Sequence, residues 1–479
     1  MEKRPHFLIV SFYIQSHVTP SLLLANRLVR WAGARATFST TVSSHRCIFS
    51  TTTNPLSFGG LLSHIPYSDG FDDGYHPGMI ADSDYYDTHL KLIASKSLSS
   101  IVGDLAAAGR PVTCIIYTCF STWAAAVARH HCIPSVPFWI QPATTFAAFW
   151  HYFHGYDSLI NANVGDPFFP VAFPSIPRLH VRDLPSLLTV TSDDPAAIHL
   201  HPLLDMCADM DSGRSSELKP KVLANTWSEL EPEAIASVAN KVEVFAIGPL
   251  PMEAAAAMAI AGSEVSIFKE DEKDYMAWLD EQPEGSVVYI SFGSYCKITK
   301  EQAEEMAKGL RESQRPYLLV LRKDNRWDGR QSMPEREGMV VEWCAQSKVL
   351  AHRAVGCFVT HCGWNSATES LAHGVPMVGL PQWMDQGTNM WLVEEWGVGV
   401  RAEVSEEGIV RAAELRRCLE RVMGPQGSSS DIESDSEIKR MARVWKERLQ
   451  QAADGAMTKR IKGFVEEFAL QEKVKLKLI

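Results

Sequence analysis

The sequence predicts an α/β protein made of two doubly wound parallel sheets, and three observations support this fold class. Short, almost uninterrupted apolar runs recur along the chain, as is typical of strands buried on both faces of a parallel sheet. Segments with helical spacing separate these runs, which is the rhythm of βαβ units. The pattern occurs in two series, and the 479 residues have room for two large domains or about three ordinary ones.

The first series starts with an apolar run at residues 7–12, which predicts a strand. We expect residues 15–18 to form a loop, followed by a helix with Thr19 as its N-cap and Pro20 at its first position. Gly33 is expected to end this helix. The same criteria predict further strands at 36–42, 112–118 and 136–140 and a helix at 122–130.

The second series begins with a strand at 285–291, which leads into a tight loop at residues 292–294. Further strands are predicted at 317–321, 355–360 and 375–380, with helices at 301–313 and 364–373. Residues 249–266, which include an alanine-rich stretch at 253–262, are the best candidate for a linker between the two series. Composition also predicts an exposed loop at 424–435 and amphipathic helix over 438–471.

Charge and composition exclude several classes of protein. The chain has 46 basic and 57 acidic residues, a net charge of −11, which argues against a nucleic-acid-binding protein or one that binds an anionic membrane. Its ten cysteines include no Cys-x-x-Cys pair and do not indicate a disulfide framework. The apolar runs are too short or too interrupted for a membrane span or a signal sequence. We therefore expect a cytoplasmic protein.

The residues that suggest chemistry are concentrated in the segment 343–386, because the common phosphate-loop, dinucleotide, zinc-protease and hydrolase motifs are all missing from the sequence. Gly363, Asn365 and Ser366 stand where a helix is predicted to begin. Free N–H groups and the positive end of the helix dipole favour an anion such as phosphate there. His361 can add a hydrogen-bond donor or a positive charge.

Other side chains of this segment suit the remaining parts of a nucleotide sugar. Trp343 offers a flat face for a base, and Glu369 can accept hydrogen bonds from a ribose diol. Asp385 and Gln386 follow a predicted strand and can bind sugar hydroxyls. Each residue alone has an ordinary explanation, such as packing for a tryptophan. Their order within one segment favours nucleotide-sugar binding.

Residues 343–386 resemble the signature segment of the plant family-1 glycosyltransferases, which depend on uridine diphosphate (UDP) sugars. The likeness is greatest to the branch with anthocyanin 5-O-glucosyltransferases and glucose-ester-forming enzymes. It also covers the first strand with its loop and histidine and residues 139–143, 181–185, 245–250 and 291–294, and so nearly the whole chain. It implies the GT-B fold, with two facing Rossmann-like domains and a cleft between them.

The resemblance implies that the acceptor lies in the cleft and the donor on the C-terminal domain. We therefore expect an acceptor-binding domain at 1–248, a linker at 249–275, a UDP-sugar domain at 276–455 and a helix at 456–479 that returns to the N-terminal domain. Matching positions imply contacts to uracil (Trp343, Ala345), ribose (Gln346, Glu369), diphosphate (Ser294, His361, Gly363, Asn365, Ser366) and sugar (Trp364, Asp385, Gln386). The closing glutamine is associated with glucose donors.

The resemblance makes His17 the general base that takes the proton of the acceptor hydroxyl, so that the sugar is transferred with inversion. Two positions depart from the family pattern: Ser16 replaces a glycine, and Thr118 replaces the aspartate that normally supports the histidine. A hydroxyl cannot stabilise an imidazolium as a carboxylate does. Thr118 is a candidate catalytic residue, and its presence favours acidic phenols and carboxylic acids as acceptors.

We expect an inverting glucosyltransferase that transfers glucose from UDP-glucose to a small, fairly apolar phenolic or flavonoid-like metabolite through oxygen. Glucose-ester formation and C-glycosylation are alternatives. A rival from another class is a non-catalytic UDP-sugar-binding protein, and an epimerase or hydrolase of the same fold is a third. We expect no cofactor, no metal and a monomer, with an acceptor pocket formed by residues 68–87 and 146–157.

Overall fold

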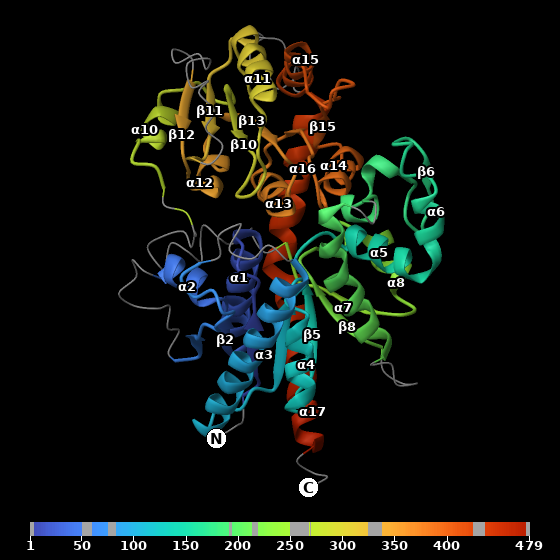
Figure 1. Ribbon diagram of the computed structural model, residues 1–479. Helices are drawn as coiled ribbons and strands as arrows, with labels where there is room; N and C mark the ends of the chain where they lie inside the picture. The colour runs from blue at the N-terminus through green and yellow to red at the C-terminus, as the bar shows by residue number, and fades with distance from the viewer. Residues whose placement is uncertain are drawn as a thin grey trace.

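Figure 1 shows a computed structural model of the chain, with two α/β domains stacked one above the other. The structure describes residues 4–49, 60–74, 83–190, 194–212, 219–249, 268, 270–323, 338–424 and 436–475. The expected linker at 249–275 and the exposed loop at 424–435 lie largely outside these residues, and the alanine-rich stretch does so entirely.

The N-terminal domain is built on a seven-stranded sheet in which every pair of neighbouring strands is parallel. The order across the sheet is β3-β2-β1-β4-β5-β8-β9. The strands are β1 (His6–Val10), β2 (Arg35–Ser39), β3 (Leu62–His64), β4 (Cys114–Thr118), β5 (Ser135–Trp139), β8 (Lys221–Ala224) and β9 (Glu243–Ala246). A short antiparallel pair, β6 (Pro170–Val171) and β7 (Leu179–His180), stands apart from this sheet.

The C-terminal domain has a six-stranded parallel sheet in the order β12-β11-β10-β13-β14-β15. Its strands are β10 (Val287–Ser291), β11 (Tyr317–Val320), β12 (Gly338–Val341), β13 (Val355–Thr360), β14 (Met377–Gly379) and β15 (Gly399–Arg401). In both sheets the strand order reverses beside the first strand, at β1/β4 and at β10/β13. Ligands of open parallel sheets bind at such switch points, outside the carboxyl ends of the strands.

Helices cover both faces of each sheet, which explains the apolar runs of the strands. In β1, Phe7 and Ile9 belong to one core and Leu8 and Val10 to the core on the opposite face. The helices of the N-terminal half are α1 (Gln15–Ala32), α2 (Val42–Phe49), α3 (Ser83–Ala107), α4 (Trp123–His130), α5 (Ala143–His151), α6 (Asp157–Asn161), α7 (His201–Ser212) and α8 (Pro232–Val238). Shorter helical turns are η1 (Tyr152–Tyr156), η2 (Val181–Asp183), η3 (Ser186–Leu188) and η4 (Pro195–Leu200).

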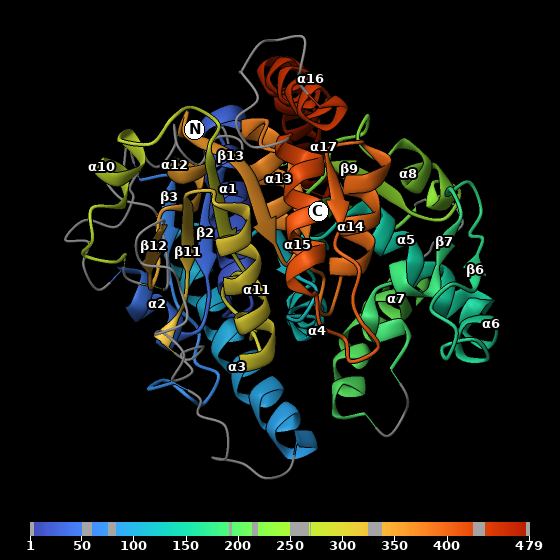
Figure 2. The ribbon, with the colours of Figure 1, turned by 90° about the horizontal axis from the view of Figure 1, so that it is seen from above.

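The C-terminal half contributes α10 (Tyr275–Asp280), α11 (Lys300–Ser313), α12 (Gln346–Leu350), α13 (Trp364–His373), α14 (Gln386–Glu395), α15 (Ala412–Met423), α16 (Glu437–Ala452), η9 (Ala453–Met457) and α17 (Thr458–Lys475). Helices α11 and α15 pack side by side, as the view from above shows (Figure 2). Helix α16 packs on α13, whereas α17 lies against α1 of the other domain (Figure 1). One continuous helical segment, from α16 to α17, therefore joins the outer surfaces of the two domains.

Helix α1 differs from its predicted start. It begins at Gln15, so Ser16 and His17 lie in its first turn and Pro20 lies inside it. A proline has no N–H to donate to the carbonyl four residues earlier, which here belongs to Ser16. That carbonyl instead accepts a 3.1 Å hydrogen bond from Nδ2 of Asn365 in the other domain. Pro20 predicts a helix start, whereas the helix begins five residues earlier, and an interdomain contact replaces the hydrogen bond that the proline removes.

The segment α17 gives a first testable prediction. Phe464 is buried, and its ring lies 5.7 Å from that of Phe7 and 5.5 Å from that of Phe245 (centroid distances), so it fills a space between the helix and the N-terminal sheet. Phe464→Ala should lower the free energy of unfolding by about 3–5 kcal/mol, because it leaves a cavity in a packed core. Denaturant titration measures this change. Phe168→Ala, at a ring that is 60% exposed, is the control and should cost less than about 1 kcal/mol.

Candidate active site

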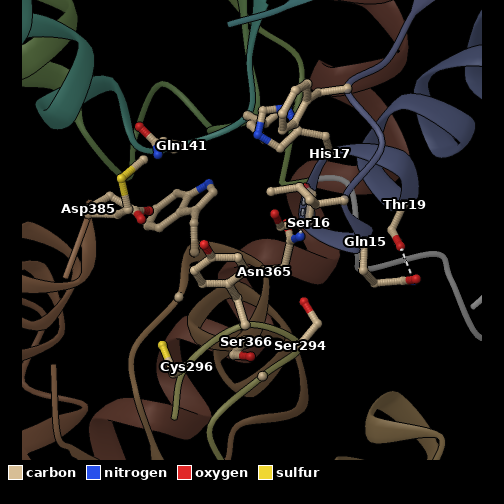
Figure 3. Close-up of a pocket in the computed structure, with 18 of the residues that line it drawn as sticks. Gln15, Ser16, His17, Thr19, Gln141, Ser294, Cys296, Asn365, Ser366 and Asp385 are labelled. Atoms are coloured by element: carbon tan, nitrogen blue, oxygen red, sulfur yellow. Dashed lines mark hydrogen bonds between the residues drawn. The ribbon is translucent and has the colours of Figure 1, made fainter. Parts of the chain in front are cut away.

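The carboxyl ends of the two sheets face one another across a single cavity of about 550 Å³. Residues that follow β1 and β4 line one side, and residues that follow β10, β13 and β14 line the other. In Figure 3, His17 lies on the side of the N-terminal domain, while Ser294 and Ser366 lie on the opposite side. The cavity is thus placed at the switch points of both sheets, as the strand order requires.

His17 lies in the first turn of α1 and lines the cavity, although it is almost completely buried. The rings of Phe12 and Phe120 pack around it, with centroids 5.4 and 5.5 Å from the imidazole. Burial lowers the pKa of His17 to about 3, and the positive end of the α1 dipole acts in the same direction. The imidazole is therefore neutral at neutral pH, and Nδ1 has no hydrogen-bond partner among the residues that the structure describes.

The structure does not give Thr118 a catalytic position. The side chain is fully buried, does not line the cavity, and its Oγ1 accepts a 3.0 Å hydrogen bond from the backbone N–H of Phe12. It therefore fixes the chain where it leaves β1 and makes no hydrogen bond to the imidazole of His17. Our expectation that Thr118 takes part in catalysis is corrected accordingly: its hydroxyl orders the backbone before His17.

The start of α13 provides the predicted anion site. Gly363, Asn365 and Ser366 line the cavity there, and Ser294 faces them from the loop after β10. Only glycine fits around the ring of His361, since a Cβ at Gly293 or Gly363 would lie 2.6–2.7 Å from it.

Burial lowers the pKa of His361 to about 4, and the charge of Arg322 acts in the same direction. His361 is thus neutral at neutral pH in this structure, which favours the hydrogen-bond donor over the positive charge that the sequence also allows.

The residues expected at the nucleoside are partly joined by hydrogen bonds. Nε2 of Gln346 donates to Oε2 of Glu369 at 2.8 Å and to Oγ of Ser366 at 3.1 Å, and all three residues line the cavity. Trp343 also lines it, and stacks on Phe268 with a centroid distance of 4.3 Å.

The backbone of Ala345, expected at uracil, already makes two hydrogen bonds within the protein. Its N–H donates to the hydroxyl of Tyr275 at 3.0 Å, its carbonyl accepts from the N–H of Val349, and the residue does not line the cavity, so its contact to uracil stays a prediction.

The sugar-contact candidates form the end of the cavity next to the N-terminal domain. Asp385 lines the cavity as the residue before α14, and Oδ2 accepts a 2.8 Å bond from Asn389. Burial raises the pKa of Asp385 to about 6, although this hydrogen bond acts in the opposite direction. Oε1 of Gln386 accepts from two backbone N–H groups of its own loop. The indole N–H of Trp364 donates to the carbonyl of Asn225 at 2.8 Å, so this residue also joins the domains.

The opposite, more apolar side of the cavity differs in part from the prediction. Residues 146–157 do not line it, because Phe146, Phe149 and Trp150 are buried in the N-terminal core. Of the other predicted segment, residues 68–74 do not line the cavity, whereas residues 75–82 and the side chains of 83–87 lie outside the described part of the chain, so that for them the prediction stays untested. The lining residues are instead Phe12, Leu90, Lys91, Phe120, Trp123, Ile140, Gln141, Ile198, His199 and Pro202. Only three of them could have been found from the sequence: Phe12, Phe120 and Ile140 follow β1, β4 and β5, and residues at the carboxyl ends of parallel strands are candidates for a ligand site.

No group of three or more His, Cys, Asp or Glu side chains suited to a metal ion occurs in the described part of the chain. None of its described helices is long and apolar enough to cross a bilayer.

The buried carboxyl of Asp385 gives a second prediction. Its folded pKa of about 6 lies above the ordinary value of 3.8, so the neutral carboxyl stabilises the fold fully below pH ~4 and this contribution is lost as the pH rises through ~6. Asp385→Asn should therefore stabilise the protein by roughly 2–3 kcal/mol at pH 8 and by almost nothing at pH 4. Urea titrations at both pH values measure the difference. Asp104→Asn, at an exposed position, is the control, and an equal gain at both pH values would contradict the assignment.

Comparison with known proteins agrees with this geometry. A family model described as "UDP-glucoronosyl and UDP-glucosyl transferase" matches residues 210–443. The chain is 38% identical to a chloroplastic crocetin glucosyltransferase of Gardenia jasminoides, over 98% of both chains. It is 36% identical to anthocyanidin 3-O-glucoside 5-O-glucosyltransferase 1 of Perilla frutescens, over 97% of this chain and 99% of the relative.

Among solved structures, Os79 from O. sativa in complex with UDP matches with a TM-score of 0.78 and 28% identity, over 96% of this chain and 100% of that one. The resemblance found in residues 343–386 is thereby confirmed, as is the fold that it implied. The chain belongs to the UDP-dependent glycosyltransferase family and is an enzyme of the GT-B fold.

Proposed function

We propose that the protein transfers glucose from UDP-glucose, with inversion, to an oxygen of a small, largely apolar plant metabolite. One observation carries the proposal: a single cavity is lined both by His17 and by the nucleotide-sugar segment 343–386. A donor held by the C-terminal domain and an acceptor in the apolar part would meet between the two sheets. Relatives that are named as glucosyltransferases of crocetin and of anthocyanidin glucosides support glucose and a metabolite of this kind.

The geometry supports a donor that lies along the start of α13. The helix N-terminus, Ser294 and the N–H of His361 can surround the diphosphate. The amide nitrogen of Asn365 has two hydrogens, so that it can bind the Ser16 carbonyl and a phosphate oxygen at the same time. Glu369 and Gln346 suit a ribose diol, and Asp385 suits the hydroxyls of the hexose. UDP would then leave on the side of the C-terminal domain.

His17 is the candidate base, and its surroundings limit what it can deprotonate. A buried imidazole with a pKa near 3 is a weak base, and no carboxylate accepts a hydrogen bond from Nδ1 among the residues that the structure describes. It can therefore deprotonate acceptors whose hydroxyl is already acidic, whereas it should accelerate transfer to a weakly acidic alcohol only slightly. We accordingly propose acidic phenols and carboxylic acids as acceptors. A carboxylic acid, ionised near neutral pH, would form a glucose ester almost without the base.

The third prediction separates these two acceptor classes. His17→Ala should reduce glucose transfer to phenols at least about a hundredfold, because the proton acceptor is removed. Transfer to carboxylic acids should fall much less. Mass spectrometry of reactions with UDP-glucose and a mixed acceptor panel measures both, and alkaline hydrolysis identifies the esters. Equal losses for both acceptor classes would contradict the proposed role, and absence of any glucoside with the unmodified enzyme would overturn the proposed function.

The fourth prediction concerns a variant that adds a carboxylate where the family usually has its aspartate. Thr118→Asp can keep the acceptor for the N–H of Phe12 while it places a carboxylate in the family's usual position. The pKa of His17 should rise, and kcat/KM for weakly acidic phenols should increase about tenfold or more, with little change for carboxylic acids.

Thr118→Asn, which has the same shape without the charge, is the matched control. A similar gain in both variants would show that charge is not the missing component.

A further inference from the structure

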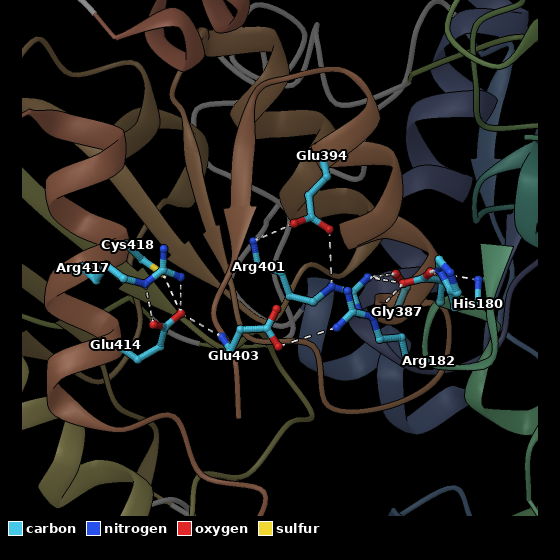
Figure 4. A network of polar contacts seen from close by, with 10 residues as sticks. His180, Arg182, Gly387, Glu394, Arg401, Glu403, Glu414, Arg417 and Cys418 are labelled. Carbon is cyan, nitrogen blue, oxygen red and sulfur yellow. Dashed lines mark hydrogen bonds and ion pairs between the residues drawn. The ribbon is translucent and has the colours of Figure 1, made fainter. Parts of the chain in front are cut away.

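Figure 4 shows a polar network in which the segment 180–188 of the N-terminal domain contacts the C-terminal domain around α14 and β15. The segment itself is anchored in the N-terminal domain, because Val181, Leu184, Leu187 and Leu188 belong to its core. The contacted loop, residues 383–386, leads into α14, whose first residue is Gln386, and all four of its residues line the cavity. We propose that Ser186, with Asp183, positions this sugar-contact loop, so that the acceptor domain sets the fit of the donor hexose.

The first support is a pair of backbone contacts at Ser186. The N–H of Met384 donates to Oγ of Ser186 at 2.7 Å, and the N–H of Ser186 donates to the carbonyl of Met384 at 2.8 Å. Both backbone groups of the residue before Asp385 are therefore held by one serine of the other domain. The Met384 side chain packs on the N-terminal core as well.

The second support is the conformation of Met384, whose φ is +59°. A residue with a Cβ rarely adopts this left-handed region, and it does so where surrounding contacts hold it there. The two hydrogen bonds between Met384 and Ser186, one donated by each residue, supply that constraint. Without them the peptide can relax toward a common conformation, and such a rotation would turn the adjacent Asp385 away from its place in the cavity.

The third support is a buried ion pair behind the loop. Nη2 of Arg401 lies 2.6 Å from Oδ1 of Asp183, and both side chains are almost fully buried. The same nitrogen donates to the carbonyl of Gly387 at 3.1 Å, and Oγ1 of Thr388 donates to the carbonyl of Asp183 at 2.7 Å. These bonds fix the first turn of α14 against the N-terminal segment. Gly387 permits the approach, since a Cβ there would lie 2.7 Å from the carbonyl of Arg182.

The contacts of Ser186 and Asp183 hold only the end of the site where the hexose is expected. Ser186 and Asp183 do not line the cavity, and the residues expected at the nucleoside and the diphosphate lie on other loops. Ser186 is therefore a positioning residue, and its loss should weaken binding of UDP-glucose without weakening binding of UDP. This inference rests on the proposed function, because it takes the 383–386 loop as the hexose contact.

Isothermal titration of the full chain with UDP and with UDP-glucose, in the absence of acceptor, tests the proposal. In Ser186→Ala we expect the Kd of UDP-glucose to rise about five- to tenfold, as for the loss of the hydrogen bond from the N–H of Met384 to Oγ; the backbone N–H of residue 186 remains. The Kd of UDP should change less than about twofold. Ser158→Ala, at an exposed serine of α6, is the matched control, and Ser186→Thr should restore binding because it keeps the hydroxyl.

Kinetics give an independent readout. The kcat/KM preference for UDP-glucose over UDP-galactose should fall in Ser186→Ala and remain in Ser158→Ala. If Ser186→Ala does not fold, Thr388→Val, which removes the bond to the Asp183 carbonyl, replaces it with the same expectation. An equal loss of affinity for UDP and UDP-glucose, or no loss for either, would overturn the proposal. Failure of the unmodified chain to bind UDP-glucose at all would instead overturn the proposed function and this inference with it.

Discussion

The arrangement of the whole site depends on the contact between the carboxyl edges of two parallel sheets. Each sheet alone presents loops to solvent, and a cavity exists because the loops face one another. Side chains of α13 hold this contact, since Trp364 donates to the carbonyl of Asn225 and Asn365 donates to that of Ser16. Both residues also line the cavity. The surface that faces the ligands is therefore the surface that joins the domains.

Burial has set the protonation states within this cavity. His17 and His361 are neutral because both imidazoles are removed from water, and Asp385 holds its proton up to a higher pH than usual for the same reason. The folded chain is less stable with these buried polar side chains than it would be with apolar residues at the same positions. In return they present hydrogen-bond donors and acceptors from buried positions, where such bonds are stronger than in water.

Most of the fold could be predicted from the sequence, and so could the part of the cavity that is lined by the segment 343–386. Strand β13 and helix α13 have the predicted bounds, because an apolar run, a turn and a closing Gly374 leave few alternatives. The residues of 343–386 come together since they follow strands of one parallel sheet. By contrast, the bond from Phe12 to Thr118 joins residues 106 positions apart, and the Asp183–Arg401 pair spans 218. No local pattern encodes such pairs, and the apolar side of the cavity likewise brings together residues that are far apart in the sequence, such as Leu90 and His199.

The proline inside α1 shows how the two domains depend on each other. By omitting one N–H, Pro20 leaves the first turn of that helix one bond short within its own domain, and Asn365 supplies it from the other. The turn that carries His17 is thus complete only in the assembled molecule. A chimaera that combines this N-terminal half with a foreign donor half would keep the turn only if the new partner offers a side-chain amide at the same place. Exchange of halves would then depend on this carbonyl as well as on the other bonds between the domains, such as those of Trp364 and Arg401.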